Sequence, residues 1–156
     1  MEGTHQGAAA RFRSVIEKDG LTEAVRFLNG VCRHRFTAVF RFDGGTLRNV
    51  CLVDREDPGA DAFPDQSVLD SYCVFVRDSR SSFAVEDAPT DGRVDGHPKQ
   101  HTVRSYCGIP LMDDDGTLVG TICHFDYDAV HFTQEDANLL DYAAPLIVRA
   151  VAATPA

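Results

Sequence analysis

The sequence predicts an α+β domain, in which helices surround a central antiparallel sheet. Two pairs of apolar, β-type segments are each joined by a tight turn that contains glycine, and they indicate β-hairpins at residues 37–53 and 103–126. Segments with the apolar periodicity of helices lie before, between and after these hairpins. Strands joined by hairpins pair antiparallel, and the apolar faces of the helices need a sheet to cover.

Two helices are predicted at the start of the chain. Residues 1–7 are polar, and we expect them to be loosely ordered. A short helix is predicted over residues 8–18, and Asp19-Gly20 ends it. The second helix is predicted over residues 21–34, because its apolar side chains recur with helical spacing along one face.

A third helix and a short strand are predicted between the two hairpins. Residues 54–64 form a polar loop that contains proline. Asp65 is then predicted to cap a helix over residues 66–76. A turn at residues 79–82 precedes a short strand at residues 83–85.

The segment 90–102 has almost no apolar side chain, and it predicts a long loop that carries His97 and His101. Loops of this length in a compact domain usually have a function. In the hairpin that follows, Pro110 predicts a bulge or an exposed strand edge. His124 is the least expected residue of the hairpin, because it places a titratable ring in an otherwise apolar strand.

The last helix is predicted from Thr133, its cap, to about Val151, with a kink at Pro145. This helix is apolar on two faces and therefore needs two partners. The sheet is one of them. The other is either the same helix of a second subunit or the N-terminal helix of the same chain.

Composition narrows the function classes. The chain has 156 residues, a net charge of -9 and 44% hydrophobic residues, which predicts one globular domain. The negative charge argues against binding to nucleic acid or to anionic membranes. We expect a cytoplasmic protein, because the sequence shows neither a spanning segment nor a secretory signal. The five cysteines are widely spaced without a Cys-x-x-Cys pair, so we expect free, buried thiols.

Several segments, in their order and spacing over residues 20–151, resemble the GAF domain, a small-molecule sensor module of signalling proteins. These segments are Val39-Phe40-Arg41-Phe42-Asp43, Ser71-Tyr72-Cys73, Phe83–Ala88, Val103–Leu111, Gly120–Cys123 and Phe132-Thr133 with Asp136. The resemblance implies five or six antiparallel strands, with the terminal helices on one face and a ligand pocket on the other. It also implies dimerisation through the terminal helices. The GAF domain is predicted at residues 21–151, between an N-terminal tail with a short helix (1–20) and a C-terminal tail (152–156).

The branches of the family differ in their ligands. The Asn-Lys pair of cyclic-nucleotide-binding members is absent. Phe40 and His124 resemble pocket residues of bilin-binding members, yet no cysteine stands where those proteins attach the bilin. His97 and His101 lie in the loop that supplies the axial histidine of haem-binding members. The cofactor is therefore left open, and no metal site is predicted.

Free methionine sulfoxide reductases are the catalytic branch of the family. Cys73 resembles one of their cysteines, but the companion positions hold none. A thiol without a resolving partner cannot turn over by disulfide exchange. We therefore predict that the chain is not an enzyme.

A pocket can be predicted from strand alternation combined with the resemblance. The resemblance turns Arg104 and Tyr106 toward the pocket and turns Ile122 and His124 the same way. Phe40 would form a wall, Tyr72 and Cys73 would cover it, and His97 and His101 would close its mouth. Arg104 could pair with a carboxylate or phosphate of the ligand, and His124 could anchor it or respond to pH.

These observations predict a cytoplasmic sensor domain that binds a small molecule and acts as a homodimer. Its output would come from a signalling partner protein or from sequence outside these 156 residues. Two alternatives stay open at this point. One is a cysteine-based redox sensor or a reductase-like enzyme that uses Cys73, and the other is a dimerisation module without a ligand.

Overall fold

A computed structural model describes residues 2–57 and 64–153. Six antiparallel strands form one sheet in the order β3-β2-β1-β6-β5-β4. The strands are β1 (Phe36–Asp43), β2 (Thr46–Asp54), β3 (Gln66–Ser67), β4 (Phe83–Val85), β5 (Ser105–Met112) and β6 (Leu118–Asp126). The helices are α1 (Glu2–Asp19), α2 (Leu21–Gly30), α3 (Cys73–Ser79) and α4 (Gln134–Ala153), with 3₁₀ turns η1 (Val68–Asp70), η2 (Ala88–Thr90) and η3 (Gly92–Val94). The predicted α+β class and both hairpins are confirmed.

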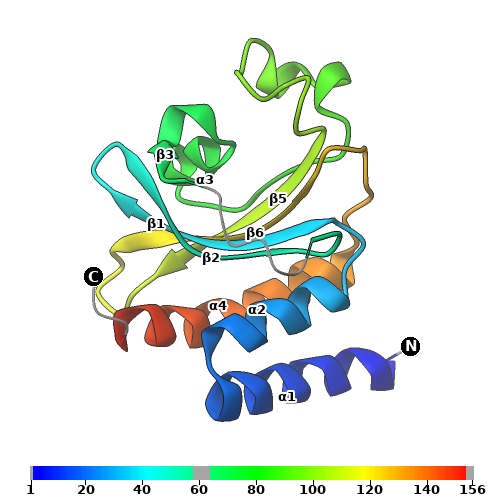
Figure 1. Cartoon of the computed structure of the whole chain (residues 1–156), viewed down its shortest axis with the longest axis vertical. Helices are drawn as coiled ribbons and strands as arrows, with labels where there is room; N and C mark the ends of the chain where they lie inside the picture. The colour runs from blue at the N-terminus through cyan, green and yellow to red at the C-terminus, as the bar shows by residue number, and fades with distance from the viewer. Residues whose placement is uncertain (1, 58–63, 154–156) are drawn as a thin grey trace.

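One face of the sheet is covered by α2 and α4, with α1 packed beneath them (Figure 1). Phe12 of α1 is fully buried in the same apolar core as Leu28 of α2 and Leu140 and Ile147 of α4. The second apolar face of α4 is thus covered by α1 within one chain. Of the two partners that the sequence left open for α4, the N-terminal helix is the one in place.

The opposite face of the sheet is covered by α3 and the segment 86–104 (Figure 1). A second apolar core lies between this layer and the sheet. Tyr72 of the covering layer lies in this core together with aromatic side chains of the strands, among them Phe36, Phe40, Tyr106 and Phe125. The sheet therefore separates two cores, and the position of a residue along a strand decides which core it joins.

The helix predicted over residues 66–76 is wrong in its first half. Asp65 does not cap it: its carboxylate accepts a hydrogen bond from Asn49 N (3.0 Å) and pairs with Arg48 (2.9 Å). Ser67 and Ser71 instead accept backbone hydrogen bonds from the residues two positions ahead. These local bonds compete with a continuous helix, so the chain forms β3, η1 and a short α3.

Two other helix limits also differ from expectation. α1 begins at Glu2 rather than at residue 8, and α2 ends at Gly30 rather than at residue 34. The start of α4 is as predicted, because Thr133 Oγ1 accepts from Asp136 N (3.0 Å) and Asp136 accepts in return from Thr133 N (3.2 Å). This reciprocal pair satisfies two backbone donors that the helix itself leaves free.

The long loop predicted over residues 90–102 is more structured than its composition indicates. It contains the turn η3, and Val94 and Gln100 within it are buried. Gln100 Nε2 donates to Ala88 O (3.3 Å) and to Asp95 (3.0 Å). These bonds join distant points of the loop and give it a fixed shape. Part of the polar loop predicted over residues 54–64 lies outside the described residues.

Within the described part of the chain, every helix is too short or too polar to cross a membrane.

Candidate functional site

A cavity of about 300 Å³ lies between the sheet and the layer formed by α3 and the segment 86–104. Its floor and walls are aromatic, with Phe40 from β1, Tyr106 from β5 and Phe125 from β6. Tyr72 covers it, and Tyr127 follows β6 at one side. Polar groups at the cavity come from β3, from the turns before α3 and from the segment that leads into β5. They are Gln66, Asp70, Ser71, Lys99 and Thr102.

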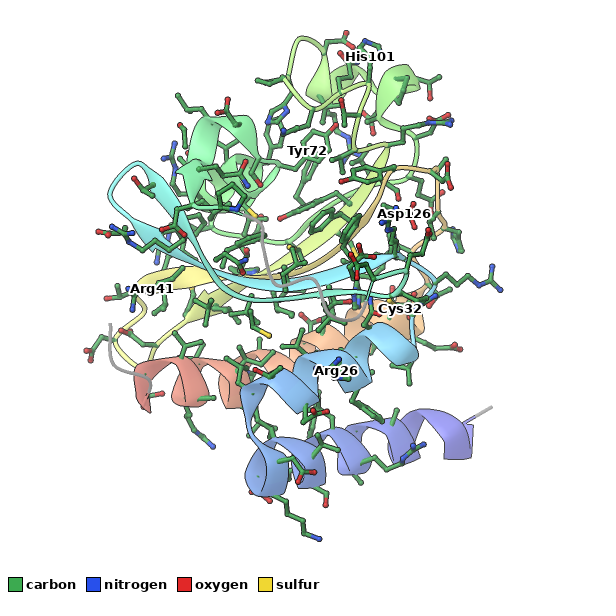
Figure 2. All side chains as sticks on the ribbon, viewed as in Figure 1. Arg26, Cys32, Arg41, Tyr72, His101 and Asp126 are labelled. Carbon is green, nitrogen blue, oxygen red and sulfur yellow. The ribbon has the colours of Figure 1, made fainter. Side chains whose placement is uncertain are left out.

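Tyr72 connects the two segments that cover the cavity. Its hydroxyl donates to Val103 O (2.9 Å), and its ring meets Tyr106 edge-on, with the centroids 5.6 Å apart. Burial, with a smaller effect from Asp91, raises the pKa of Tyr72 to about 12. The phenol therefore stays neutral and keeps its proton for the hydrogen bond. Figure 2 shows Tyr72 directed between the covering layer and the sheet.

Tyr106 lies between the cavity and a buried sulfur. Its ring lines the cavity, and its hydroxyl donates to Cys73 Sγ (3.2 Å). The hydroxyl lies directly over Gly108, where an added Cβ would come within 2.2 Å of it. Only glycine leaves room for this side chain at position 108. The sequence expectation that Tyr106, Phe40, Tyr72 and Cys73 gather on this side of the sheet agrees with their positions, although Cys73 lies behind the cavity wall.

Cys73 is fully buried among hydrogen-bonding groups. Besides Tyr106, Thr121 Oγ1 lies 3.3 Å from its sulfur. Burial would raise the pKa of Cys73, but hydrogen bonds from Cys123, Ser71, Thr121 and Tyr106 together lower it to about 7. Cys73 thus differs from an ordinary buried thiol, whose pKa burial raises.

The two loop histidines do not meet at the mouth of the cavity. His97 packs against Tyr72, with the ring centroids 4.6 Å apart, and its Nδ1 accepts from Lys99 N (3.0 Å). Burial lowers the pKa of His97. His101 is exposed at the outer end of the loop, far from the sheet (Figure 2). His97 therefore supports the cover of the cavity, and the expected position of His101 at the mouth is wrong.

Arg104 does not line the cavity, contrary to expectation. Its guanidinium pairs with Asp87 (3.2 Å), and both side chains are about two-fifths exposed. The residue lies just before β5, where its backbone N–H donates to Asp126 O (3.0 Å). Because Arg104 is outside the strand, strand alternation does not determine the direction of its side chain, which lies along the surface.

The expected orientation of Ile122 and His124 is also wrong, because both lie on the face of β6 that the helices cover. The register pairs Cys107 with His124 and Tyr106 with Phe125. Residues directly opposite each other in a sheet point to the same side. Phe125 and Cys123 therefore accompany Tyr106, whereas Ile122 joins the core under the helices.

His124 belongs to a buried polar cluster beneath the helices. Its Nδ1 lies 2.7 Å from Thr37 Oγ1 and 3.4 Å from Cys32 Sγ, and its ring stacks on His34 with the centroids 5.8 Å apart. Burial, then His34 and Arg55, lowers the pKa of His124 to about 3. Burial also lowers the pKa of His34. Both rings are therefore neutral, and they lie in the interior under the helices rather than at the cavity.

Among the cavity residues that sequence reasoning missed are Phe125, Tyr127, Lys99 and Thr102. Phe125 could have been found, because it follows His124 in the strand and therefore points to the opposite face. The prediction assigned the wrong one of these two faces to the cavity. The other three lie in loops, whose positions have no periodicity. The described residues form no group of three or more His, Cys, Asp or Glu arranged to hold a metal ion.

Comparison with solved structures places the fold among GAF domains. The GAF domain of a Coxiella burnetii phosphoenolpyruvate-protein phosphotransferase is 14% identical, with a TM-score of 0.74 over 95% of this chain and 92% of that one. The free methionine-R-sulfoxide reductase of Neisseria meningitidis, solved with its substrate, is 16% identical, with a TM-score of 0.72 over 92% and 85%. At such identities the likeness shows the fold alone.

A third similar structure is the chromophore-binding domain of Stigmatella aurantiaca bacteriophytochrome. It is 15% identical, with a TM-score of 0.74, and the match covers 97% of this chain and 60% of that one. A search of curated protein sequences found no match. The sequence model of the GAF domain family matches residues 18–151. The chain therefore belongs to the GAF domain family, the sensor modules of signalling proteins.

Proposed function

We propose that this GAF domain senses a small, largely apolar molecule that binds in the aromatic cavity. The cavity is the observation that carries the proposal: it combines apolar walls with a few polar groups at its edge, which is the usual composition of a ligand site. Phe40, Tyr72 and Tyr106 are the ligand contacts that remain from the sequence prediction. Phe125 joins them as the contact from β6.

The size and lining of the cavity indicate the class of ligand. A volume of about 300 Å³ is at the lower end of the range for small-molecule sites. It suits one or two fused rings rather than a tetrapyrrole. Rings favour offset or edge-on contacts with the surrounding aromatic side chains. Lys99 and Asp70 offer one cation and one carboxylate for polar substituents of such a ligand.

A substitution at the edge of the cavity tests this function. Thr102 is exposed and lines the cavity, so Thr102→Trp would fill the entrance without disturbing the core. We expect its affinity for an aromatic probe such as indole to fall about tenfold or more, which corresponds to about 1.4 kcal/mol. Isothermal titration calorimetry would measure the affinity for indole. Biliverdin serves as a comparison ligand that we expect to be too large for the cavity.

Thr117→Trp is the matched control, because Thr117 is exposed in the β5–β6 turn and does not line the cavity. It should bind the probe as the wild type does. Equal affinity in both variants would contradict the proposed site. A wild-type protein that carries no small molecule in native mass spectrometry and binds none of a panel of aromatic acids and amines would favour the dimerisation module instead.

We also propose that the protein is a cytoplasmic homodimer whose sensor domain comprises residues 21–151. A signalling partner protein would receive its signal. Tyr142 on α4 is 37% exposed, and Leu146 near it is partly buried, which leaves some apolar surface beside α1. We expect light scattering after size exclusion to give twice the chain mass of 17.1 kDa. In Tyr142→Glu the mass should fall toward that of one chain. A wild-type mass of one chain would contradict the dimer.

A further inference from the structure

Two cysteines that are far apart in the sequence meet behind the cavity. Cys73 is the first residue of α3, and Cys123 lies on the cavity-side face of β6. Both are fully buried in the core between the sheet and its covering layer, and the Cys123 thiol donates to Ala38 O (3.7 Å). Thr121, two residues before Cys123 on the same face, contacts the Cys73 sulfur at 3.3 Å. The companion positions of the reductases hold no cysteine, but the fold brings Cys123 of β6 into the same buried region as Cys73 of α3.

The surroundings of Cys73 favour its thiolate. The Tyr106 hydroxyl donates to the sulfur at 3.2 Å, and the Thr121 hydroxyl lies at 3.3 Å on β6. Hydrogen bonds to a charged form stabilise that form. Together with the larger contributions of Cys123 and Ser71, they outweigh burial and lower the pKa of Cys73 to about 7. Burial and the neighbouring Cys73 raise the pKa of Cys123 well above its ordinary value. Of the two thiols, Cys73 is therefore the one that ionises more readily.

The other three cysteines lack this arrangement. Burial raises the pKa of Cys32 to about 11, and it also raises those of Cys51 and Cys107. Cys32 and Cys107 lie on the side of the sheet that the helices cover. All five are free thiols. Because the thiolate is the reactive form of cysteine, Cys73 is distinguished from the rest by its neighbours and not by exposure.

Tyr106 separates Cys73 from the cavity. Its ring lines the cavity, and its hydroxyl contacts the sulfur on the other side. A small oxidant that enters the cavity therefore reaches the thiolate by displacing one side chain.

We propose that Cys73 and Cys123 form a redox-active pair, which a hydroperoxide oxidises to an intramolecular disulfide. The Cys73 thiolate attacks one peroxide oxygen, so that an S–O bond forms, the O–O bond breaks and the leaving hydroxide takes up a proton to give water. Cys123 then loses its proton and attacks the Cys73 sulfur. The S–S bond forms, the S–O bond breaks, and a second water leaves. Overall, two thiols are oxidised and one hydrogen peroxide is reduced to two waters.

Peptide mapping after peroxide treatment tests the pair directly, and it needs no ligand for the cavity. The folded protein is treated with hydrogen peroxide, blocked with N-ethylmaleimide in denaturant, and digested without reductant. We expect one disulfide that joins the peptides containing Cys73 and Cys123, with the other three cysteines alkylated. A disulfide between other cysteines, or five alkylated thiols, would overturn the proposal.

Three variants separate the roles of the two thiols. In Cys123→Ser, dimedone should trap a sulfenic acid on Cys73 and no disulfide should form. In Tyr106→Phe the ring stays but one donor is lost, so the pKa of Cys73 should rise, and we expect oxidation at pH 7 to slow about fivefold for a rise of one unit from about 7. Cys51→Ser is the control and should oxidise at the wild-type rate. Circular dichroism of each variant checks the fold, and an unchanged rate in Tyr106→Phe would contradict the role of its hydroxyl.

Discussion

Replacement of Gly120 by alanine is expected to lower the free energy of unfolding by about 3 kcal/mol or more, the upper range for overpacking a well-packed site. Gly120 pairs with Arg41 across the β1–β6 ladder. A Cβ at this position would lie 1.9 Å from Phe40 O and 3.0 Å from Arg41 Cα. Both are backbone atoms of the paired strand, so no side-chain rotation can relieve the contact.

Urea unfolding at neutral pH would measure this loss. Gly45→Ala is the matched control, because an added Cβ there meets no atom within 4 Å and the residue does not need a positive φ. We expect Gly45→Ala to change stability by less than about 1 kcal/mol. Equal stability of the two variants would show that β1 and β6 can separate at this point without cost. Because Phe40 and Phe125 come from these two strands, we also expect Gly120→Ala to lose the cavity.

Acidification is expected to destabilise the protein before its carboxylates titrate. His34 and His124 are buried and neutral, and their pKa values lie below the ordinary histidine value of 6.5, that of His124 at about 3. Below pH 6.5 the unfolded chain binds protons that the folded chain does not bind. Stability is therefore fully present above pH 6.5 and is lost as pH falls toward the folded pKa, by up to about 1.4 kcal/mol per pH unit for each histidine.

Unfolding in urea at pH 7 and pH 5 would reveal this effect. One deeply buried histidine should account for about 2 kcal/mol between these two pH values. His124→Gln cannot become charged, yet its amide can still bond to Thr37, so the difference should shrink by about that amount. His101→Gln is the control at an exposed position and should keep the wild-type difference. The same pH dependence in wild type and His124→Gln would refute a role for His124.

The local features of the fold could be predicted from the sequence because adjacent residues determine them. The capping pair of Thr133 and Asp136 needs only the spacing of those two residues. The turn at Gly116 needs only a residue that tolerates its φ of 79°. The prediction of the third helix was wrong, and the cause is again local. The side chains of Ser67 and Ser71 accept hydrogen bonds from the backbone donors that a longer helix would use.

The sequence by itself determined the α+β class, both hairpins and the capped last helix, and it identified four aromatic or thiol residues on the cavity side. These features could be predicted because apolar periodicity and turn chemistry are encoded within short segments. Only the tertiary structure decided which face of β6 meets the cavity. Ile122, Cys123 and Phe125 are all apolar, so alternation could not fix the phase, and the register with β5 did. The same register places Cys123 on the face of Cys73 and places His124 on the face that the helices cover. Neighbouring residues of a strand point to opposite faces, so a shift of one residue would exchange them.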